Sequence, residues 1–199
     1  MTLFLTLLLT SYLLGSLSTA ILVCRLLNCP DPRDIGSGNP GATNVLRLAG
    51  KKAAAITLLG DAFKGAPPLL IGKLYGLDPI LLTWIGAASV LGHVLPVFYK
   101  FRGGKGVATF LGMNIILNPL LAALYITIWL LAASVSRYSS VGAMIATIAC
   151  PLCAWFLELP PPIIMLYSAL SLLILIRHRN NLRNLMKGEE KQIGDKTKL

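Results

Sequence analysis

Long apolar runs separated by short polar stretches dominate the sequence. Most of these runs approach the length of about 20 residues that a membrane-spanning helix requires. They cover residues 1–27, 53–74, 78–99, 120–135, 141–157 and 161–176. A shorter apolar segment, residues 107–117, is closed by Asn118-Pro119, and we expect a half-helix there or a span in locally thinned bilayer. The pattern predicts an all-α polytopic membrane protein with about seven transmembrane helices, one of them short, and glycine-rich cytoplasmic loops.

Composition supports the same class of protein. Hydrophobic residues make up 55% of the 199 residues and charged residues 13%, and the mean hydropathy is +0.72, which is unlike a soluble domain. We expect a single integral-membrane domain over residues 1–199. The Cys150-x-x-Cys153 pair lies inside an apolar run without partner ligands, so we interpret it as packing rather than a metal or redox site.

The positive charges indicate how the chain crosses the membrane. A net charge of +10 could suggest nucleic acid, but the cations lie between and after the apolar runs rather than along a solvated surface. If the N-terminus is outside, 16 of the 18 lysines and arginines fall in inside segments, with Lys73 outside and Lys64 within a span. The positive-inside rule therefore predicts an external N-terminus and a cytoplasmic C-terminus. We expect no nucleic-acid partner.

The first polar stretch, residues 36–47, has the sequence GSGNPGATNVLR. Its glycines let backbone N–H groups turn toward one point, as in an anion-binding nest. Asn39 followed by Pro40 predicts a helix start, and Gly50 a stop. Such a helix end attracts phosphate, and Arg47 can bind phosphate with two parallel hydrogen bonds. An ordinary glycine-rich loop between helices is the alternative.

Two further clusters fall on the same predicted side of the membrane. Residues 101–106, FRGGKG, again place flexible backbone and a cation before a helix, without the spacing of a Walker P-loop. Residues 177–181, RHRNN, place His178 and Asn181 three residues apart on a continuing helix. Taken alone, this third segment is more typical of an interfacial amphipathic anchor.

Buried charge is expected within the second span. Asp61 and Lys64 are three residues apart on one helical face, where they either pair with each other or face a polar cavity.

Three cationic clusters on one face imply a site for more than one phosphate at the depth of lipid headgroups. Carboxylates are scarce near the clusters: Asp31 and Asp34 flank the first, and the others lie in the tail. We therefore expect no Mg²⁺ site and no cofactor.

The three clusters together resemble the motifs of a known family. GSGNPGATNVLR, GHVLPVFYKFRGGKG and RHRNNLRNLMKGEE are similar, in order and predicted side, to those of the integral-membrane acyl-phosphate:glycerol-3-phosphate acyltransferases, the PlsY family. The resemblance implies a seven-span bacterial inner-membrane enzyme of phospholipid synthesis. Such an enzyme acylates the 1-hydroxyl of glycerol 3-phosphate from acyl phosphate, releasing phosphate and 1-acylglycerol 3-phosphate.

The resemblance also implies roles for individual residues. The catalytic set that it implies is Ser37, Arg47, Lys105, His178 and Asn181. The substrate- and phosphate-binding set is Gly38, Asn39, Gly41, Thr43, Asn44, Gly103, Gly104 and Ser140. Glu190 matches the structural acid of the third motif, and we expect Asp61, Lys64 and His93 to be structural polar residues. Two positions depart from the family pattern, Ala143 where a second serine is usual and Asn184 where an arginine is usual.

The chemistry needs no cofactor, because acyl phosphate is a mixed anhydride and attack by a hydroxyl mainly requires positioning and charge stabilisation. Either His178 or a substrate phosphate can be the general base, and we favour the phosphate because no carboxylate stands beside His178. We expect Ser37 to bind phosphate rather than to be acylated, since the sequence gives it no partnered base.

Two other functions compete with this hypothesis. A small anion or phosphate-ester transporter would need a site near the bilayer midplane, built on repeated halves, and we find no internal repeat. A non-catalytic lipid-binding scaffold would need the basic tail but not three glycine-rich clusters. We expect a monomer whose partners are its two substrates and the bilayer; the preferred acyl length is not determined by the sequence.

Overall fold

The computed structural model describes residues 1–195, and every regular element in that range is a helix. In chain order the elements are α1 (Thr2–Gly15), α2 (Thr19–Leu26), α3 (Ala42–Phe63), α4 (Ala66–Leu74), α5 (Pro79–Val94), the 3₁₀ helix η1 (Val97–Tyr99), α6 (Val107–Leu117), α7 (Pro119–Ser136), α8 (Ser139–Phe156), α9 (Pro161–Arg177) and α10 (Arg179–Lys187). The expected all-α class is confirmed.

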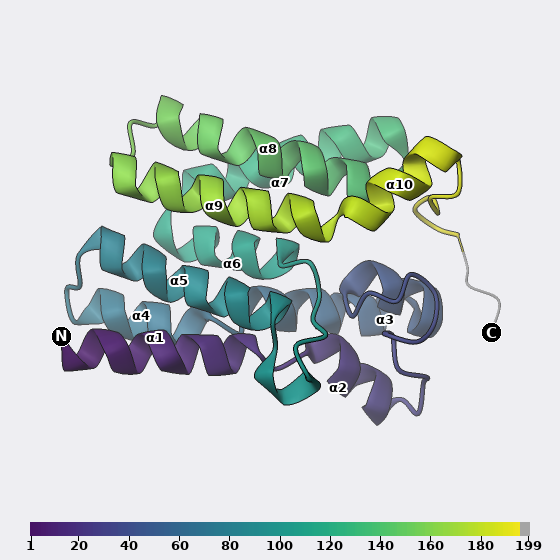
Figure 1. Cartoon of the computed structure of the whole chain (residues 1–199), viewed down its shortest axis with the longest axis horizontal. Coiled ribbons are helices and arrows are strands. Elements are labelled where there is room, and N and C mark those ends of the chain that lie inside the picture. The colour runs from purple at the N-terminus through teal and green to yellow at the C-terminus, as the bar shows by residue number, and fades with distance from the viewer. Residues whose placement is uncertain (196–199) are drawn as a thin grey trace.

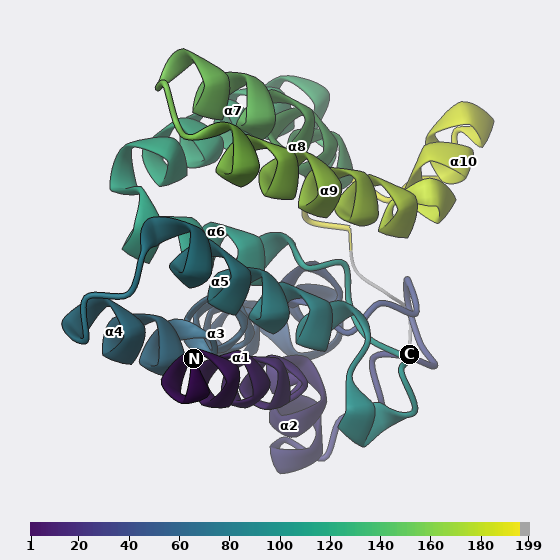
Figure 2. The same ribbon diagram turned by 60° about the vertical axis from the view of Figure 1, so that its left-hand side comes forward.

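The helices form two groups with α6 between them (Figures 1 and 2). One group holds α7, α8 and α9, and the other holds α1 to α5, in which α1 packs along α5 and α2 along α3. The short helix α6 contacts α3, α5 and α7. Its Phe110 meets Tyr125 and Tyr167 edge-on, with ring centroids 5.7 and 5.8 Å apart. These aromatic contacts join α6 to the group of α7, α8 and α9 in the core.

Several segments have the length and hydropathy of membrane spans. Four qualify alone: Ala42–Leu74, Pro79–Tyr99, Pro119–Ser136 and Ser139–Phe156. The bent pairs α1–α2 and α9–α10 bring the number to six if each pair is one span, and α6 is a shorter apolar helix of 11 residues. Large apolar side chains such as Leu131 and Val135, 63% and 86% exposed, suit a surface that faces lipid. The total of seven crossings stays a prediction.

The chain bends within the first expected span and again directly after the last one. The apolar run 1–27 breaks between α1 and α2 with a bend of 42°, where the side chain of Ser18 caps α2 by accepting from Ile21 N. The sequence suggested that the third polar cluster lies on a continuing helix, but the structure shows a break there. His178 stands at a bend of 49° between α9 and α10, so the chain changes direction at this residue.

The helix after the first glycine-rich stretch also differs from the prediction. It begins at Ala42 with Gly41 as its N-cap residue, so neither Asn39 nor Pro40 has its predicted place at the helix start. The predicted interruption at Gly50 is present, with φ 82° and ψ −176°, a conformation that is essentially restricted to glycine. Two separate helical segments therefore meet at a kink at Gly50.

The three polar clusters lie at one end of the molecule. Figure 1 shows the loop before α3, the loop before α6 and helix α10 together at the end opposite the N-terminus. Lys196 and Lys198, which contributed to the predicted charge asymmetry, lie outside the described residues.

Candidate active site

The first glycine-rich loop is folded around the buried side chain of Asn44. Its Nδ2 donates to two backbone carbonyl oxygens of the loop, at 2.8 and 3.0 Å, and its Oδ1 accepts from Ser37 N at 3.1 Å. Gly36 and Gly38 have φ of 72° and 68°, which glycine adopts without a steric penalty. The loop therefore has a fixed curve with Ser37 exposed on it. Within residues 1–195 the Ser37 hydroxyl has no histidine as a hydrogen-bond partner, which suits a phosphate ligand better than an activated nucleophile.

The second loop is held from two sides by backbone contacts. Gly104 N donates to the carbonyl oxygen of His93 at 3.1 Å. From the other side Arg177 donates to the carbonyl oxygens of Gly103 and Gly104, at 2.8 and 3.2 Å. Lys105 follows directly before α6. Arg177 thus uses its guanidinium to shape the loop, a role that the sequence did not suggest.

The third cluster is organised by Glu190. One oxygen of this carboxylate, Oε1, accepts from Ser140 Oγ at 2.6 Å and from Asn181 Nδ2 at 2.7 Å. It therefore joins the start of α8 to α10. Charge-assisted hydrogen bonds of this length are among the stronger ones in proteins.

The chain after Glu190 returns across the site. Arg47 Nη2 donates to the carbonyl oxygens of Lys191 and Gln192, at 3.1 and 3.4 Å. Thr43 Oγ1 lies 3.2 Å from Ser139 Oγ, which links α3 to α8. These contacts place the three clusters around one space.

A single cavity of about 550 Å³ connects the clusters. Its polar end is lined by Ser37, Gly38, Asn39, Gly41, Thr43, Asn44, Arg47, Gly103, Lys105, Ser140, His178, Asn181 and Glu190. Its apolar end is lined by Leu58, Val107, Ala108, Leu111, Tyr125, Ile126, Trp129 and Leu130. The predicted site residues are thus brought together, apart from Gly104, which lies behind the lining against His93. The apolar end was not predicted, because its residues look like ordinary span residues in the sequence.

The two positions that depart from the family pattern both face this space. Ala143 and Asn184 are among the lining residues, whereas Arg183 is not. Arg183 therefore does not replace the arginine usual at position 184.

Burial lowers the pKa of two side chains at the polar end, Lys105 and His178. It lowers the pKa of Lys105 to about 8; Glu190 opposes this shift, and Arg47 and Arg177 add to it. Burial and the charge of Lys105 lower the pKa of His178 to about 4, against the effect of its hydrogen bond to Ile174. At neutral pH the site thus combines an ammonium group with a neutral imidazole.

The tautomer of His178 follows from its neighbour. Its Nδ1 lies 2.8 Å from the carbonyl oxygen of Ile174, and since a carbonyl only accepts, Nδ1 carries the proton. The lone pair is therefore on Nε2.

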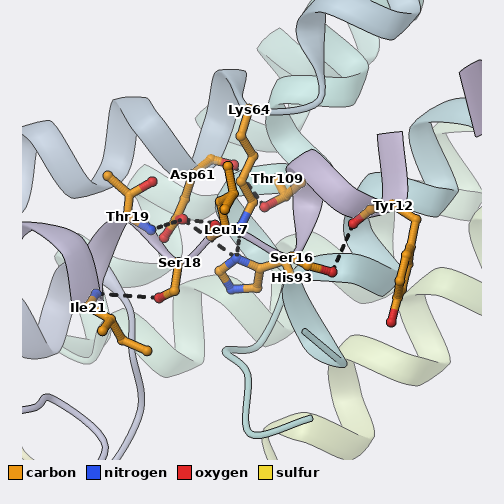
Figure 3. A network of polar contacts seen from close by, with 10 residues as sticks. All are labelled: Tyr12, Ser16, Leu17, Ser18, Thr19, Ile21, Asp61, Lys64, His93 and Thr109. Atoms are coloured by element: carbon orange, nitrogen blue, oxygen red, sulfur yellow. Dashed lines mark hydrogen bonds and ion pairs between the residues drawn. The ribbon is translucent and has the colours of Figure 1, made fainter. Parts of the chain in front are cut away.

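The predicted pair of Asp61 and Lys64 forms and includes a third member, His93. Lys64 Nζ lies 3.3 Å from Asp61 Oδ1 and 2.8 Å from His93 Nδ1, as Figure 3 shows. Asp61 and His93 are also among the residues that line the cavity. The pair and the cavity, weighed as alternatives from the sequence, are both present.

In the part of the chain that the structure describes, no group of three or more histidine, cysteine or acidic side chains is placed to hold a metal ion. The polar groups that line the cavity are cations, amides, hydroxyls and backbone groups, together with the carboxylates of Asp61, Glu189 and Glu190.

Fold and site define a class: a polytopic helical membrane protein whose cavity is cationic at one end and apolar at the other, as a phosphorylated amphiphile requires. The chain belongs to the glycerol-3-phosphate acyltransferase family, whose sequence model matches residues 5–188.

Individual relatives agree with this assignment. The glycerol-3-phosphate acyltransferase of Photobacterium profundum is 49% identical over 94% of this chain and 91% of its own. That of Pseudomonas syringae pv. tomato is 53% identical over 91% and 93%. The crystal structure of PlsY (YgiH), an integral membrane glycerol 3-phosphate acyltransferase, in its glycerol 3-phosphate form superposes with a TM-score of 0.91 at 40% identity, covering 96% of each chain. Its lysophosphatidic acid form gives 0.87 at 38% identity, covering 96% of this chain and 95% of that one.

Proposed function

We propose that the protein transfers an acyl chain from acyl phosphate to the 1-hydroxyl of glycerol 3-phosphate, giving 1-acylglycerol 3-phosphate and phosphate. The observation that carries the proposal is the single cavity in which a polar end with Lys105 and Arg47 continues into an apolar end. A phosphorylated acceptor suits the polar end of the cavity, and an acyl chain suits the apolar end. A relative was solved in a lysophosphatidic acid form, which is the product expected from this reaction.

Lys105 and Arg47 have different roles in binding the two phosphates. The Lys105 ammonium offsets the charge that develops on the departing phosphate. The guanidinium of Arg47 orients a phosphate by two parallel hydrogen bonds. Backbone N–H groups of the first loop and Ser37 complete the anion site. Two phosphate groups that would repel each other in water are thereby brought close together, and this proximity is the main catalytic contribution.

The proton of the attacking hydroxyl passes to a substrate phosphate in this mechanism. A phosphate ester has a second pKa of about 6, whereas the pKa of His178 is lowered to about 4. The phosphate is therefore the stronger base. His178 and Asn181 then serve to orient the acceptor, with His178 Nε2 accepting a hydrogen bond from a glycerol hydroxyl.

The proposal places the site at the cytoplasmic face of a bacterial inner membrane, with the N-terminus outside and a monomer as the working unit. Support comes from the distribution of positive charge, in which 16 of 18 lysines and arginines fall on one predicted side of the membrane. The acceptor then enters from the cytoplasm, and the acyl chain reaches the apolar end from the bilayer.

The donor is tested with purified protein, glycerol 3-phosphate and either acyl phosphate or acyl-CoA, with lysophosphatidate measured in the presence and absence of EDTA. We expect product with acyl phosphate only, and the same rate in EDTA. Product from acyl-CoA alone would refute the donor, and rescue by Mg²⁺ after chelation would refute the metal-free mechanism. Uptake of glycerol 3-phosphate into vesicles without acylation would favour a transporter.

A further inference from the structure

Three ionisable side chains are buried beneath the phosphate-binding end. Asp61 lies near the end of α3, Lys64 directly after it, and His93 in the last turn of α5. The side chains of Asp61, Lys64 and His93 are only 2%, 7% and 6% exposed. Burying such groups in a membrane protein is costly and normally marks function or tight pairing. The reaction proposed above uses none of them.

The network fixes the plane and the tautomer of the His93 imidazole. Lys64 Nζ donates to Asp61 Oδ1, to the carbonyl oxygen of Leu17 at 3.0 Å, and to His93 Nδ1. An ammonium group has no acceptor capacity, so Nδ1 is the acceptor and the ring proton is on Nε2. Asp61 Oδ1 is 3.7 Å from Nδ1, too far for a hydrogen bond, and it acts on the ring by holding Lys64. Figure 3 shows the ring at the centre of these contacts.

The opposite edge of the same ring meets the second glycine loop. A Cβ on Gly104 would overlap His93 Nε2 and would lie 3.0 and 3.1 Å from Cε1 and Cδ2 of the ring. The backbone N–H of Gly104 also donates to the carbonyl oxygen of His93. On the far side of Lys105, Thr109 Oγ1 donates to the carbonyl oxygen of Asp61 at 2.8 Å. The buried network therefore contacts the chain both before and after Lys105.

We propose that His93 is a positioning residue, whose imidazole edge, held by Lys64 and Asp61, fixes Gly104 and thereby the place from which Lys105 reaches the cavity. A loop of two glycines is flexible, and the long side chain of lysine adds its own freedom. Arg177 holds the loop from one side only. The imidazole supplies the support on the other side. The inference rests on the proposed role of Lys105 as a phosphate-binding cation.

The contact is tested by relieving it sterically. Gly104→Ala alone should lower kcat/KM by about 10²-fold, the loss expected when a catalytic group is displaced by roughly 1 Å, with the change mainly in kcat. His93→Asn keeps an acceptor near Nδ1 for Lys64 and removes the ring atoms that the added methyl group would strike. In that background Gly104→Ala should cost at least about tenfold less, which is within the range measured for coupled contacts. His93→Gln keeps an atom near Nε2 and should give no relief.

Gly103→Ala is the matched control. Its Cβ would overlap the carbonyl oxygen of His93 and the ring of Pro96 rather than the imidazole, so His93→Asn should not rescue it. Equal costs of Gly104→Ala in the wild-type and His93→Asn backgrounds would overturn the proposal, as would equal rescue of Gly103→Ala.

A second readout is independent of the donor and of the chemistry. The steric coupling exists without substrate, so the loss of thermal stability caused by Gly104→Ala in detergent should also shrink in the His93→Asn background. This readout decides the proposal even if acyl phosphate proves to be the wrong donor. If His93→Asn does not fold, Asp61→Asn/Lys64→Met replaces it, because the ring then loses its anchor and can move aside. Undiminished damage by Gly104→Ala in that background would overturn the proposal equally.

Discussion

At the scale of single residues, three cations near the cavity have different roles. Arg177 holds the carbonyl oxygens of a glycine loop, Arg47 holds those of the tail, and Lys105 is the cation beside His178. Two of the three cations therefore shape backbone as well as contributing charge. Lys105 differs because burial makes its own charge sensitive to pH.

Lys105 should give the reaction an alkaline limit. Its pKa is about 8 in the folded protein, so the ammonium is charged below that pH and loses its proton above it. We expect kcat/KM, which reports the free enzyme, to fall as the pH rises through about 8. Arginine keeps its charge throughout this pH range, so Lys105→Arg should abolish this alkaline limb of the pH profile even though its activity is lower. A wild-type profile that stays flat to about pH 10 would contradict the assignment.

His178 distinguishes the two candidates for the base. If substrate phosphate accepts the proton, His178→Gln should reduce kcat by less than about 10²-fold and keep a rising limb near the phosphate pKa of about 6. If His178 is the base, the loss should reach about 10²–10⁴-fold, and the wild-type limb should lie near the His178 pKa of about 4. The measurement is the pH profile of kcat for both proteins, with folding checked by thermal stability.

At the scale of elements, α10 and the segment after it form one wall of the site. The sequence of α10 alone is typical of an interfacial anchor, and its apolar residues Leu182 and Met186 are 51% and 75% exposed. Its other side carries Asn181, which bonds to Glu190, and the chain then leads to the tail that Arg47 holds. The helix can therefore lie at the membrane surface and still build the site.

Glu190 should be replaceable by glutamine but not by alanine. The amide oxygen of Glu190→Gln can still accept from Ser140 and Asn181, whereas Glu190→Ala leaves both donors unpaired. We expect a loss of about 1.5–3 kcal/mol in stability for alanine, the usual range for hydrogen bonds to a charged group, and a smaller loss for glutamine. Because Glu190 raises the pKa of Lys105, Glu190→Gln should also move the alkaline limb to lower pH. Thermal melts in detergent and pH profiles measure the two effects, and a limb that does not move would contradict the coupling.

At the scale of the whole molecule, the fold gathers polar groups at one end and leaves apolar helix surfaces along its length. The cavity is lined by the polar clusters and also by apolar residues of α6 and α7, such as Leu111 and Trp129. In the proposed reaction, this arrangement lets a water-soluble acceptor and a lipid-soluble donor reach the same cavity from different phases.

The orientation can be checked by labelling cysteines from each side. The native cysteines, all free, are first replaced, and single cysteines are then placed at Lys187 and at Tyr75, which is 72% exposed. With the positive charge inside, Lys187→Cys should react with an impermeant reagent only from the cytoplasmic side and Tyr75→Cys only from outside. Labelling of position 187 from outside would reverse the whole arrangement.

The sequence by itself determined the class of protein and indicated most of the residues that line the polar end of the candidate site. Helix positions followed from the lengths of apolar runs, and the break at Gly50 from residue type, because both are local properties of the chain. The polar clusters stood out since amides, glycines and cations are rare within apolar runs. The family motifs then indicated which members to expect around the phosphates.

Tertiary structure decided how those residues meet. Ser140 and Glu190 are 50 residues apart in the sequence, and Arg177 and Gly104 are 73 apart, so their contacts depend on how helices pack. Spans that are apolar all round carry no periodic signal of which face is buried, and the apolar end of the cavity was therefore hidden. The contact of His93 with Gly104 likewise joins the end of α5 to the loop before α6 and depends on tertiary packing.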